Sequence, residues 1–157
     1  RIGYIAGPKG MKSTRERLEG FREALEKHGC KPGKDMIARG AYTFESGIEC
    51  GRNLLENPKP PTAIFASNDE MAVGVINAAQ DMGLNVPGDL SVAGFDDSIL
   101  ASRSFPKLTT VRRPVKAMAR LATTKLIASI DGRDEDARSG DMLVPSLIKR
   151  NSTRSIS

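Results

Sequence analysis

The chain has one histidine and two cysteines in 157 residues, which leaves little material for metal or nucleophilic chemistry. His28 is the only histidine, so no second histidine is available for a Ser–His–Asp or Cys–His arrangement elsewhere in the chain. Cys30 and Cys50 lack the paired spacing of a metal site, and two cysteines do not make a disulfide framework. We therefore predict a protein that is not an enzyme, that holds no metal or cofactor, and whose thiols stay reduced in the cytoplasm.

Long apolar runs are also missing, because no stretch of about 18 apolar residues occurs, and the sequence predicts no membrane span. The net charge of +5 is modest, and the basic residues between Arg103 and Lys125 are balanced by an acidic stretch from Asp131 to Asp136. Few aromatic residues interleave with these charges, and no helix-turn-helix pattern is present. The chain is therefore not expected to read DNA by itself.

Short apolar runs alternate with amphipathic segments along most of the sequence. Strands are expected at 2–7, 36–41, 62–66 and 90–95, and helices are expected to follow the S-x-x-E patterns at Ser13, Ser46 and Ser67. Gly29 and Gly83 are placed to end two of these helices. A further helix is predicted from Val115 to Ile130 and a last strand at 143–149. The order β-α-β-α-β-α-β predicts the α/β class, a parallel open sheet with helices on both faces.

Polar side chains follow the ends of the predicted strands, where open α/β sheets bind their ligands. Arg15, Tyr42, Asn68 and Asp96 supply a guanidinium, an aromatic ring, an amide and a carboxylate. Such a set suits a polyol, since vicinal hydroxyls donate and accept together and an aromatic ring covers the apolar face of a sugar. Two structural alternatives stay open: Asn68 and Asp69 cap a helix, and Asp96 pairs with Arg15 only to hold the loops.

Three motifs in order carry a family resemblance: NDEMAVGV, VPGDLSVAGFDD and PKLTTVRRP. Together they resemble the ligand-binding domain of LacI/GalR-type transcriptional regulators, which has two lobes of the periplasmic-binding-protein-like type. The resemblance implies that residues 1–112 and 146–157 form the C-terminal lobe. Residues 113–145 would then belong to an N-terminal lobe that is mostly absent, which leaves the apolar face of the Val115–Ile130 helix without its native partner.

The resemblance also implies roles for individual residues. Arg15, Asn68 and Asp96 match positions that hold the effector, a sugar or sugar derivative, and Tyr42 matches the stacking aromatic residue. Arg113 stands where some relatives carry a glutamine that touches ligand, so a phosphorylated or carboxylate effector and a solvent-facing arginine are both open.

The same resemblance predicts a homodimer that binds operator DNA only through an N-terminal headpiece. Four residues match positions at the dimer interface: Met71, Val73, Arg103 and Ser104. Three rival functions remain: a periplasmic sugar-binding protein of a transporter, an enzyme that uses Asp96, and a regulator that answers to a partner protein instead of an effector.

Overall fold

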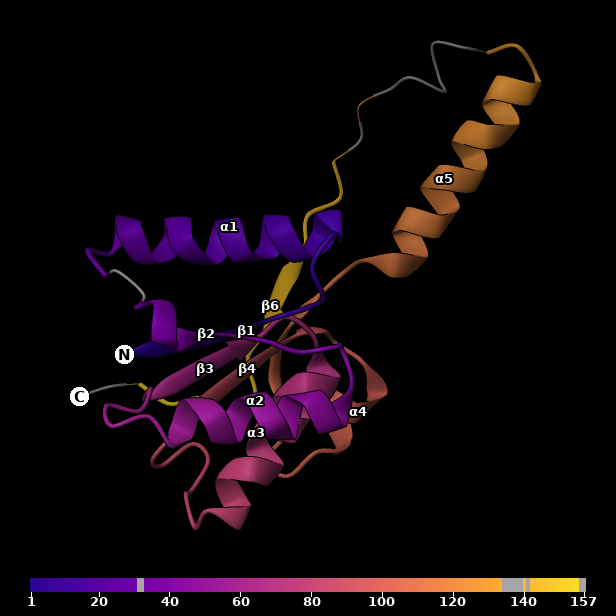
Figure 1. Cartoon of the computed structure of the whole chain (residues 1–157). Helices are drawn as coiled ribbons and strands as arrows, with labels where there is room; N and C mark the ends of the chain where they lie inside the picture. Colours follow the sequence, from indigo (N-terminus) through magenta and orange to yellow (C-terminus); the bar gives the residue numbers. More distant parts are fainter. Residues whose placement is uncertain (31–32, 134–139, 141, 156–157) are drawn as a thin grey trace. The chain divides into compact units, whose positions relative to one another are not determined.

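The computed structural model describes residues 1–30, 33–133, 140 and 142–155 (Figure 1). Contacts divide the chain into two units, Arg1–Val111 with Leu147–Ser157, and Arg112–Ser146. The first unit contains most of the sheet and the helices that cover it. The predicted acidic stretch lies largely outside the described residues.

A six-stranded sheet has the order β2-β1-β3-β4-β5-β6, and β1 pairs in parallel with β2 and β3, as does β3 with β4. The predicted α/β class with a mostly parallel sheet is confirmed. The strands are β1 (Ile2–Ala6), β2 (Ile37–Arg39), β3 (Ala63–Ala66), β4 (Ser91–Asp96), β5 (Thr109–Arg112) and β6 (Ser146–Ile148). The helices are α1 (Lys12–Lys27), α2 (Phe44–Leu55), α3 (Asp69–Asp81), α4 (Ile99–Arg103) and α5 (Val115–Ile130), with a 3₁₀ turn, η1, at Lys34–Met36.

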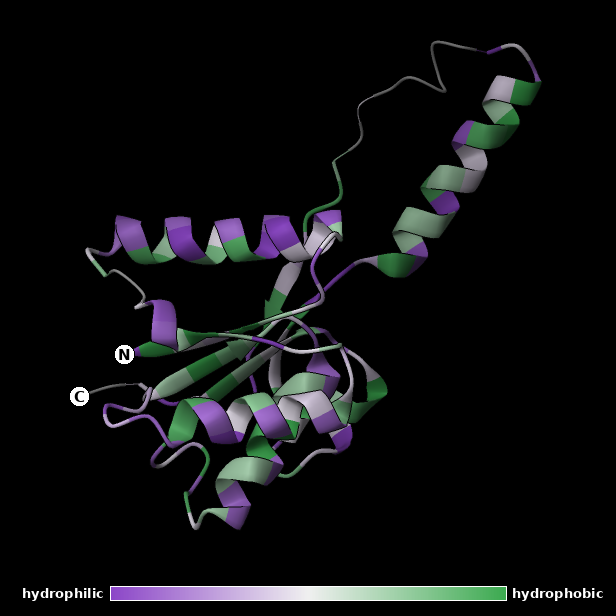
Figure 2. Cartoon of the chain, viewed as in Figure 1, coloured by the Kyte–Doolittle hydropathy of each residue, from purple (hydrophilic) through white to green (hydrophobic). Residues whose placement is uncertain are grey.

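Helix α1 lies on one face of the sheet, and α2 and α3 lie on the other (Figure 1). The alternation of side chains along β1 explains this, because Tyr4 belongs to a buried cluster with α1, whereas Ile5 belongs to the larger cluster with α2 and α3. Tyr4 stacks on Phe21 of α1 with ring centroids 4.6 Å apart. Apolar residues therefore line both faces of the central strands, as Figure 2 shows by their hydrophobic colouring.

Glycines allow α2 and α3 to approach backbone to backbone. A Cβ atom added at Gly47 would lie 2.3 Å from the carbonyl oxygen of Met71, and one added at Gly74 would lie 2.3 Å from that of Phe44. No side chain fits in such a space, so the two glycines fix how closely the helices cross.

The helices begin at other residues than the capping patterns predict. At α1, Met11 precedes the helix and makes no side-chain capping bond. At α2, Thr43 is the cap, and its hydroxyl accepts from the N–H of Ser46. At α3, the Oδ1 atom of Asn68 accepts from the N–H of Met71. The expected caps at Ser13, Ser46 and Ser67 are therefore wrong. The expected stops are confirmed, since Gly29 and Gly83 adopt φ angles of 69° and 76° just after α1 and α3.

Within the second unit, α5 spans the predicted residues and exposes several large apolar side chains. Figure 2 shows hydrophobic and hydrophilic residues alternating along it. The exposed ones are Val115, Met118, Leu126, Ile127 and Ile130. The last predicted strand is shorter than expected and is limited to Ser146–Ile148. In the described part of the chain no helix combines the length and apolar character needed to cross a membrane.

Candidate ligand-binding site

Polar and aromatic side chains gather where the parallel strands of the first unit end. Gly7 follows β1, Tyr42 follows β2, Asn68 follows β3, and β4 ends at Asp96. Because neighbouring parallel strands end at the same edge of a sheet, these four residues lie along one edge. This is the edge at which open α/β sheets bind ligands.

Arg17 of α1 supplies a cation at this edge, and its side chain is only 17% exposed. Its guanidinium donates to the carbonyl oxygen of Ser67 and covers the ring of Phe95, with Cζ 4.0 Å from the ring centroid. The Nη2 atom lies 3.8 Å from Oδ1 of Asp96, too far for a direct hydrogen bond. The guanidinium of Arg17, held by Ser67 and Phe95, thus stands beside the carboxylate of Asp96, and these two kinds of group suit the hydroxyl groups of a polyol.

Arg15 is not brought to this group. Its side chain is 66% exposed and lies 3.8 Å from Glu19 one turn later on α1. The alternative expectation paired Asp96 with Arg15, whereas the structure pairs Asp96 with Arg17. Sequence reasoning missed Arg17, although its spacing held a signal: it lies three residues after Thr14 and four before Phe21, both on the buried face of α1.

Tyr42 closes the same edge from the loop after β2. Its backbone adopts a φ of 66°, and its ring lies over Gly7, where an added Cβ would come within 2.1 Å of the ring. The phenol hydroxyl shares a 2.8 Å hydrogen bond with the hydroxyl of Thr14. The ring is therefore held at its face and at its tip.

Asn68 uses both ends of its amide within the chain. Oδ1 accepts from the N–H of Met71 at 3.0 Å, and Nδ2 donates to the carbonyl oxygen of Tyr42 at 2.9 Å. The expected cap at the start of α3 is thus present at Asn68, together with a bond to the loop that carries Tyr42.

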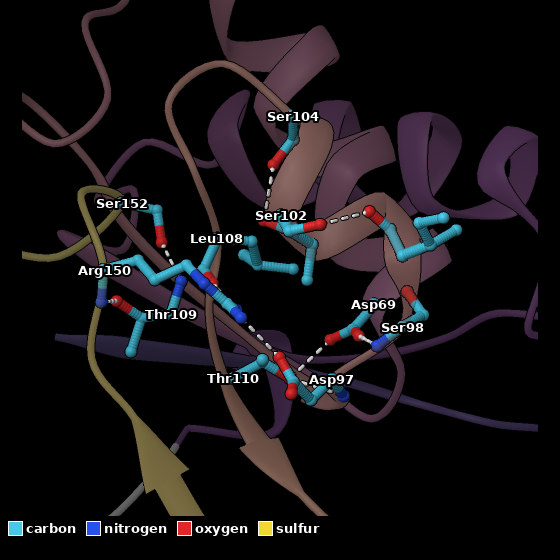
Figure 3. A network of polar contacts seen from close by, with 12 residues as sticks. Asp69, Asp97, Ser98, Ser102, Ser104, Leu108, Thr109, Thr110, Arg150 and Ser152 are labelled. Carbon is cyan, nitrogen blue, oxygen red and sulfur yellow. Dashed lines mark hydrogen bonds and ion pairs between the residues drawn. The ribbon is translucent and has the colours of Figure 1, made fainter.

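Asp69 and Asp97 make structural contacts within the first unit (Figure 3). The carboxylate of Asp69 is buried and accepts from the hydroxyl of Thr110 at 2.5 Å and from the N–H of Ser98 at 2.6 Å. Burial raises the pKa of Asp69 above its ordinary value, and these two hydrogen bonds oppose the rise. Asp97 accepts from Nη2 of Arg150 at 2.6 Å, which fastens the end of the chain to the loop after β4.

The four expected interface residues lie in different surroundings. Met71 is fully buried in the core of its own unit, so its side chain offers no surface to a second subunit. Val73 is half-buried and Arg103 is exposed, whereas the hydroxyl of Ser104 donates to the backbone carbonyls of Ala101 in α4 and of Pro106. The neighbouring Phe105 is 88% exposed.

A surface pocket of about 730 Å³ lies beside Phe105 and away from the strand ends. It is lined by Gln80, Leu84, Asn85, Val86, Pro87, Phe105, Pro106, Lys107 and Asn151. Its apolar lining suits contact with a macromolecule better than binding of a polyol. We therefore locate the ligand by the polar groups at the strand edge and not by the size of this pocket.

Arg113 belongs to the second unit, directly before Pro114 and the start of α5. Its backbone carbonyl accepts from the N–H of Val115 at 2.8 Å. Among the described residues, no three His, Cys, Asp or Glu side chains gather as they would around a metal ion.

Comparison with known proteins identifies the class. The family of the periplasmic binding protein-like domain matches residues 1–153. The repressor CytR of Escherichia coli K12, an HTH-type transcriptional repressor, is 41% identical over 157 residues, which cover 99% of this chain and 46% of CytR. A LacI-family regulatory protein from Chloroflexus aggregans has a TM-score of 0.90 at 35% identity over 98% of this chain and 55% of that one. A complex of the transcriptional regulator CelR with cellobiose has a TM-score of 0.86 at 33% identity, covering 97% of this chain and 46% of CelR.

The chain therefore belongs to the periplasmic binding protein-like domain family, and it matches the ligand-binding domain of LacI/GalR regulators. It spans about half the length of these relatives. The relatives named above are regulators of transcription, and neither enzymes nor transport proteins are among them.

Proposed function

We propose that this chain is the effector-sensing part of a DNA-binding transcriptional repressor. The effector is a sugar or sugar derivative that binds at the carboxyl edge of the sheet of this lobe, and residues 113–145 belong to a second lobe. The protein acts in the cytoplasm and has no catalytic role. This function needs no cofactor.

The observation that carries the proposal is the pair of Arg17 and Asp96 at the strand edge. Their side chains are 17% and 30% exposed, so both are anchored in the fold yet reachable from outside. A guanidinium and a carboxylate 3.8 Å apart are the kinds of group that bind neighbouring hydroxyl groups of a sugar. Tyr42 adds an aromatic ring at the same edge of the sheet, over Gly7 after β1. The cellobiose bound by CelR, a relative of similar fold, supports a carbohydrate as the effector class.

The link to DNA rests on the relatives, because CytR is a helix-turn-helix repressor and the chain corresponds to about half of it. We propose that two copies associate and place two headpieces on a two-fold operator, with effector binding favouring one lobe arrangement. Such a coupling between sites amounts to about 1–3 kcal/mol.

The test is a thermal-shift screen of the full-length protein with sugars, sugar phosphates and sugar acids. A compound that raises the melting temperature should also change the affinity for operator DNA. Stabilisation without any effect on DNA binding would separate a simple binding protein from a sensor. A screen without any stabilising sugar, sugar phosphate or sugar acid would remove the effector claim.

A further inference from the structure

Tyr42 holds a backbone conformation that tyrosine rarely adopts. Its φ of 66° lies in the left-handed region, where the Cβ atom of any residue except glycine meets the neighbouring carbonyl oxygen. Such a conformation persists when the surrounding structure imposes it, and residues of this kind cluster at functional sites.

Three contacts from different parts of the chain hold Tyr42 in place. The ring lies over Gly7 after β1, the hydroxyl bonds to Thr14 of α1, and the carbonyl oxygen accepts from Nδ2 of Asn68. The Asn68 contact acts on the backbone itself, since it fixes the direction of the peptide group that follows the left-handed turn. The other two act on the side chain.

We propose that Asn68 is a positioning residue: its amide nitrogen holds the Tyr42 backbone so that the ring stands as a preset wall of the ligand site. Only the consequence for effector affinity rests on the proposed function, because the ordering of the ring exists without any ligand. Asn68 acts here through Tyr42, and direct contact with the effector is not required.

A helix cap alone does not account for the Asn68 contacts. Capping α3 uses only the Oδ1 acceptor, and serine or aspartate supplies an equivalent oxygen at an N-cap. Neither has an N–H donor for the carbonyl of Tyr42. Asn68→Ser and Asn68→Asp therefore keep the cap and remove only the contact to the loop.

The experiment labels the full-length protein with 3-fluorotyrosine and follows the Tyr42 resonance by ¹⁹F NMR, assigned through Tyr42→Phe. In the unsubstituted protein the resonance should lie well away from that of free fluorotyrosine. In both Asn68 variants it should move at least halfway to the free position. Asn85→Ser is the matched control, because the Asn85 amide oxygen accepts from the N–H of Gly88 in the loop between α3 and β4. It should leave the resonance in place.

An unchanged Tyr42 resonance in Asn68→Ser and Asn68→Asp would overturn the proposal and leave Asn68 as a cap only. Using both variants keeps the test decisive if one of them fails to fold. Any sugar or sugar phosphate that stabilises the parent protein is then titrated into the variants, where at least a five-fold loss of affinity is expected. If no such compound binds, the effector proposal fails, whereas the NMR result still decides the role of Asn68.

Discussion

Arg17 lies over the ring of Phe95, with Cζ 4.0 Å from the ring centroid, and the same guanidinium is 3.8 Å from the carboxylate of Asp96. The aromatic face and the carbonyl of Ser67 orient the fork before any ligand arrives. Donors held in this way lose little side-chain entropy on binding, which favours affinity.

Replacing Arg17 with alanine should weaken effector binding by about 10- to 100-fold, since hydrogen bonds to charged groups contribute about 1.5–3 kcal/mol. Arg15→Ala is the matched control two residues away, and it should change the affinity less than about two-fold because exposed ion pairs contribute little. Isothermal titration of the full-length protein measures both. Equal losses in the two variants would contradict the assignment of the site to Arg17.

The difference between Arg15 and Arg17 shows where sequence reasoning stops. Two residues along a helix correspond to a rotation of about 200°, so these arginines flank the buried stripe of α1 on opposite sides. The spacing of Leu18 and Phe21 in the sequence is enough to predict the buried stripe itself. Which flank faces the end of β4 depends on how α1 lies on the sheet, and that packing is not encoded in the spacing.

The caps predicted from the S-x-x-E patterns were wrong for a related reason, although Asn68 had been kept as an alternative cap for α3. The sequence offers several serines, threonines and asparagines near each start, all of which can cap a helix. Which of them caps the helix depends on where the preceding strand or loop ends. In this structure the caps are Thr43 for α2 and Asn68 for α3. By contrast, the α/β order follows from apolar periodicity and glycine stops, and these are local properties that the sequence states directly.

The buried carboxylate of Asp69 should give the protein an unusual pH response. Because burial raises its pKa in the folded state, the folded protein keeps a proton that the unfolded chain has already lost, over the interval above the ordinary carboxyl pKa. The contribution of Asp69 to the free energy of unfolding should therefore fall as the pH rises through that interval, by at most about 1.4 kcal/mol per pH unit.

Urea unfolding of the parent protein and of Asp69→Asn across the acid range measures this contribution as a difference. Asparagine retains an acceptor for the N–H of Ser98 and can donate to Thr110, so the variant should fold. Asp81→Asn is the control, because it changes an exposed carboxylate and leaves Asp69 in place. Parallel stability profiles for the parent and Asp69→Asn would refute the expected response.

Alanine at Gly74 or Gly47 should destabilise the protein by at least about 1–3 kcal/mol, because the new methyl group meets backbone atoms that cannot move aside. Gly20→Ala in α1 is the opposite case. Nothing lies within 4 Å of its added Cβ, so that change should stabilise the protein by about 0.5–1 kcal/mol. Urea unfolding gives the values, and a neutral Gly74→Ala would show that the two helices separate easily.

Phe105→Asp should weaken self-association of the full-length protein at least ten-fold if the loop of Arg103 and Ser104 lies at the subunit interface. An 88% exposed phenylalanine beside an apolar pocket is the kind of anchor that buried interfaces use. Met11→Asp introduces the same charge at another exposed apolar residue, at the start of α1, and should leave the dimer intact. Sedimentation velocity over a concentration series distinguishes the variants. If Phe105→Asp still forms the dimer, the subunit interface does not include the loop of Phe105.

Arg113→Gln removes a fixed positive charge at the start of α5. If the effector carries a phosphate or carboxylate, its affinity should fall by about ten-fold or more, while that of a neutral sugar should stay the same. Competition between a sugar and its phosphate on the full-length protein gives the ratio directly. If the ratio of the two affinities does not change, Arg113 faces solvent and does not contact the effector.

Helices α2 and α3 meet at Gly47 and Gly74 without side chains between them, so their crossing has no slack. The loop of Tyr42 leads into α2, and Asn68 begins α3. A displacement of the Tyr42 loop or of Asn68 should therefore move α2 and α3 together as one rigid unit. When a ligand contacts the ring of Tyr42, the C-terminal ends of both helices should shift.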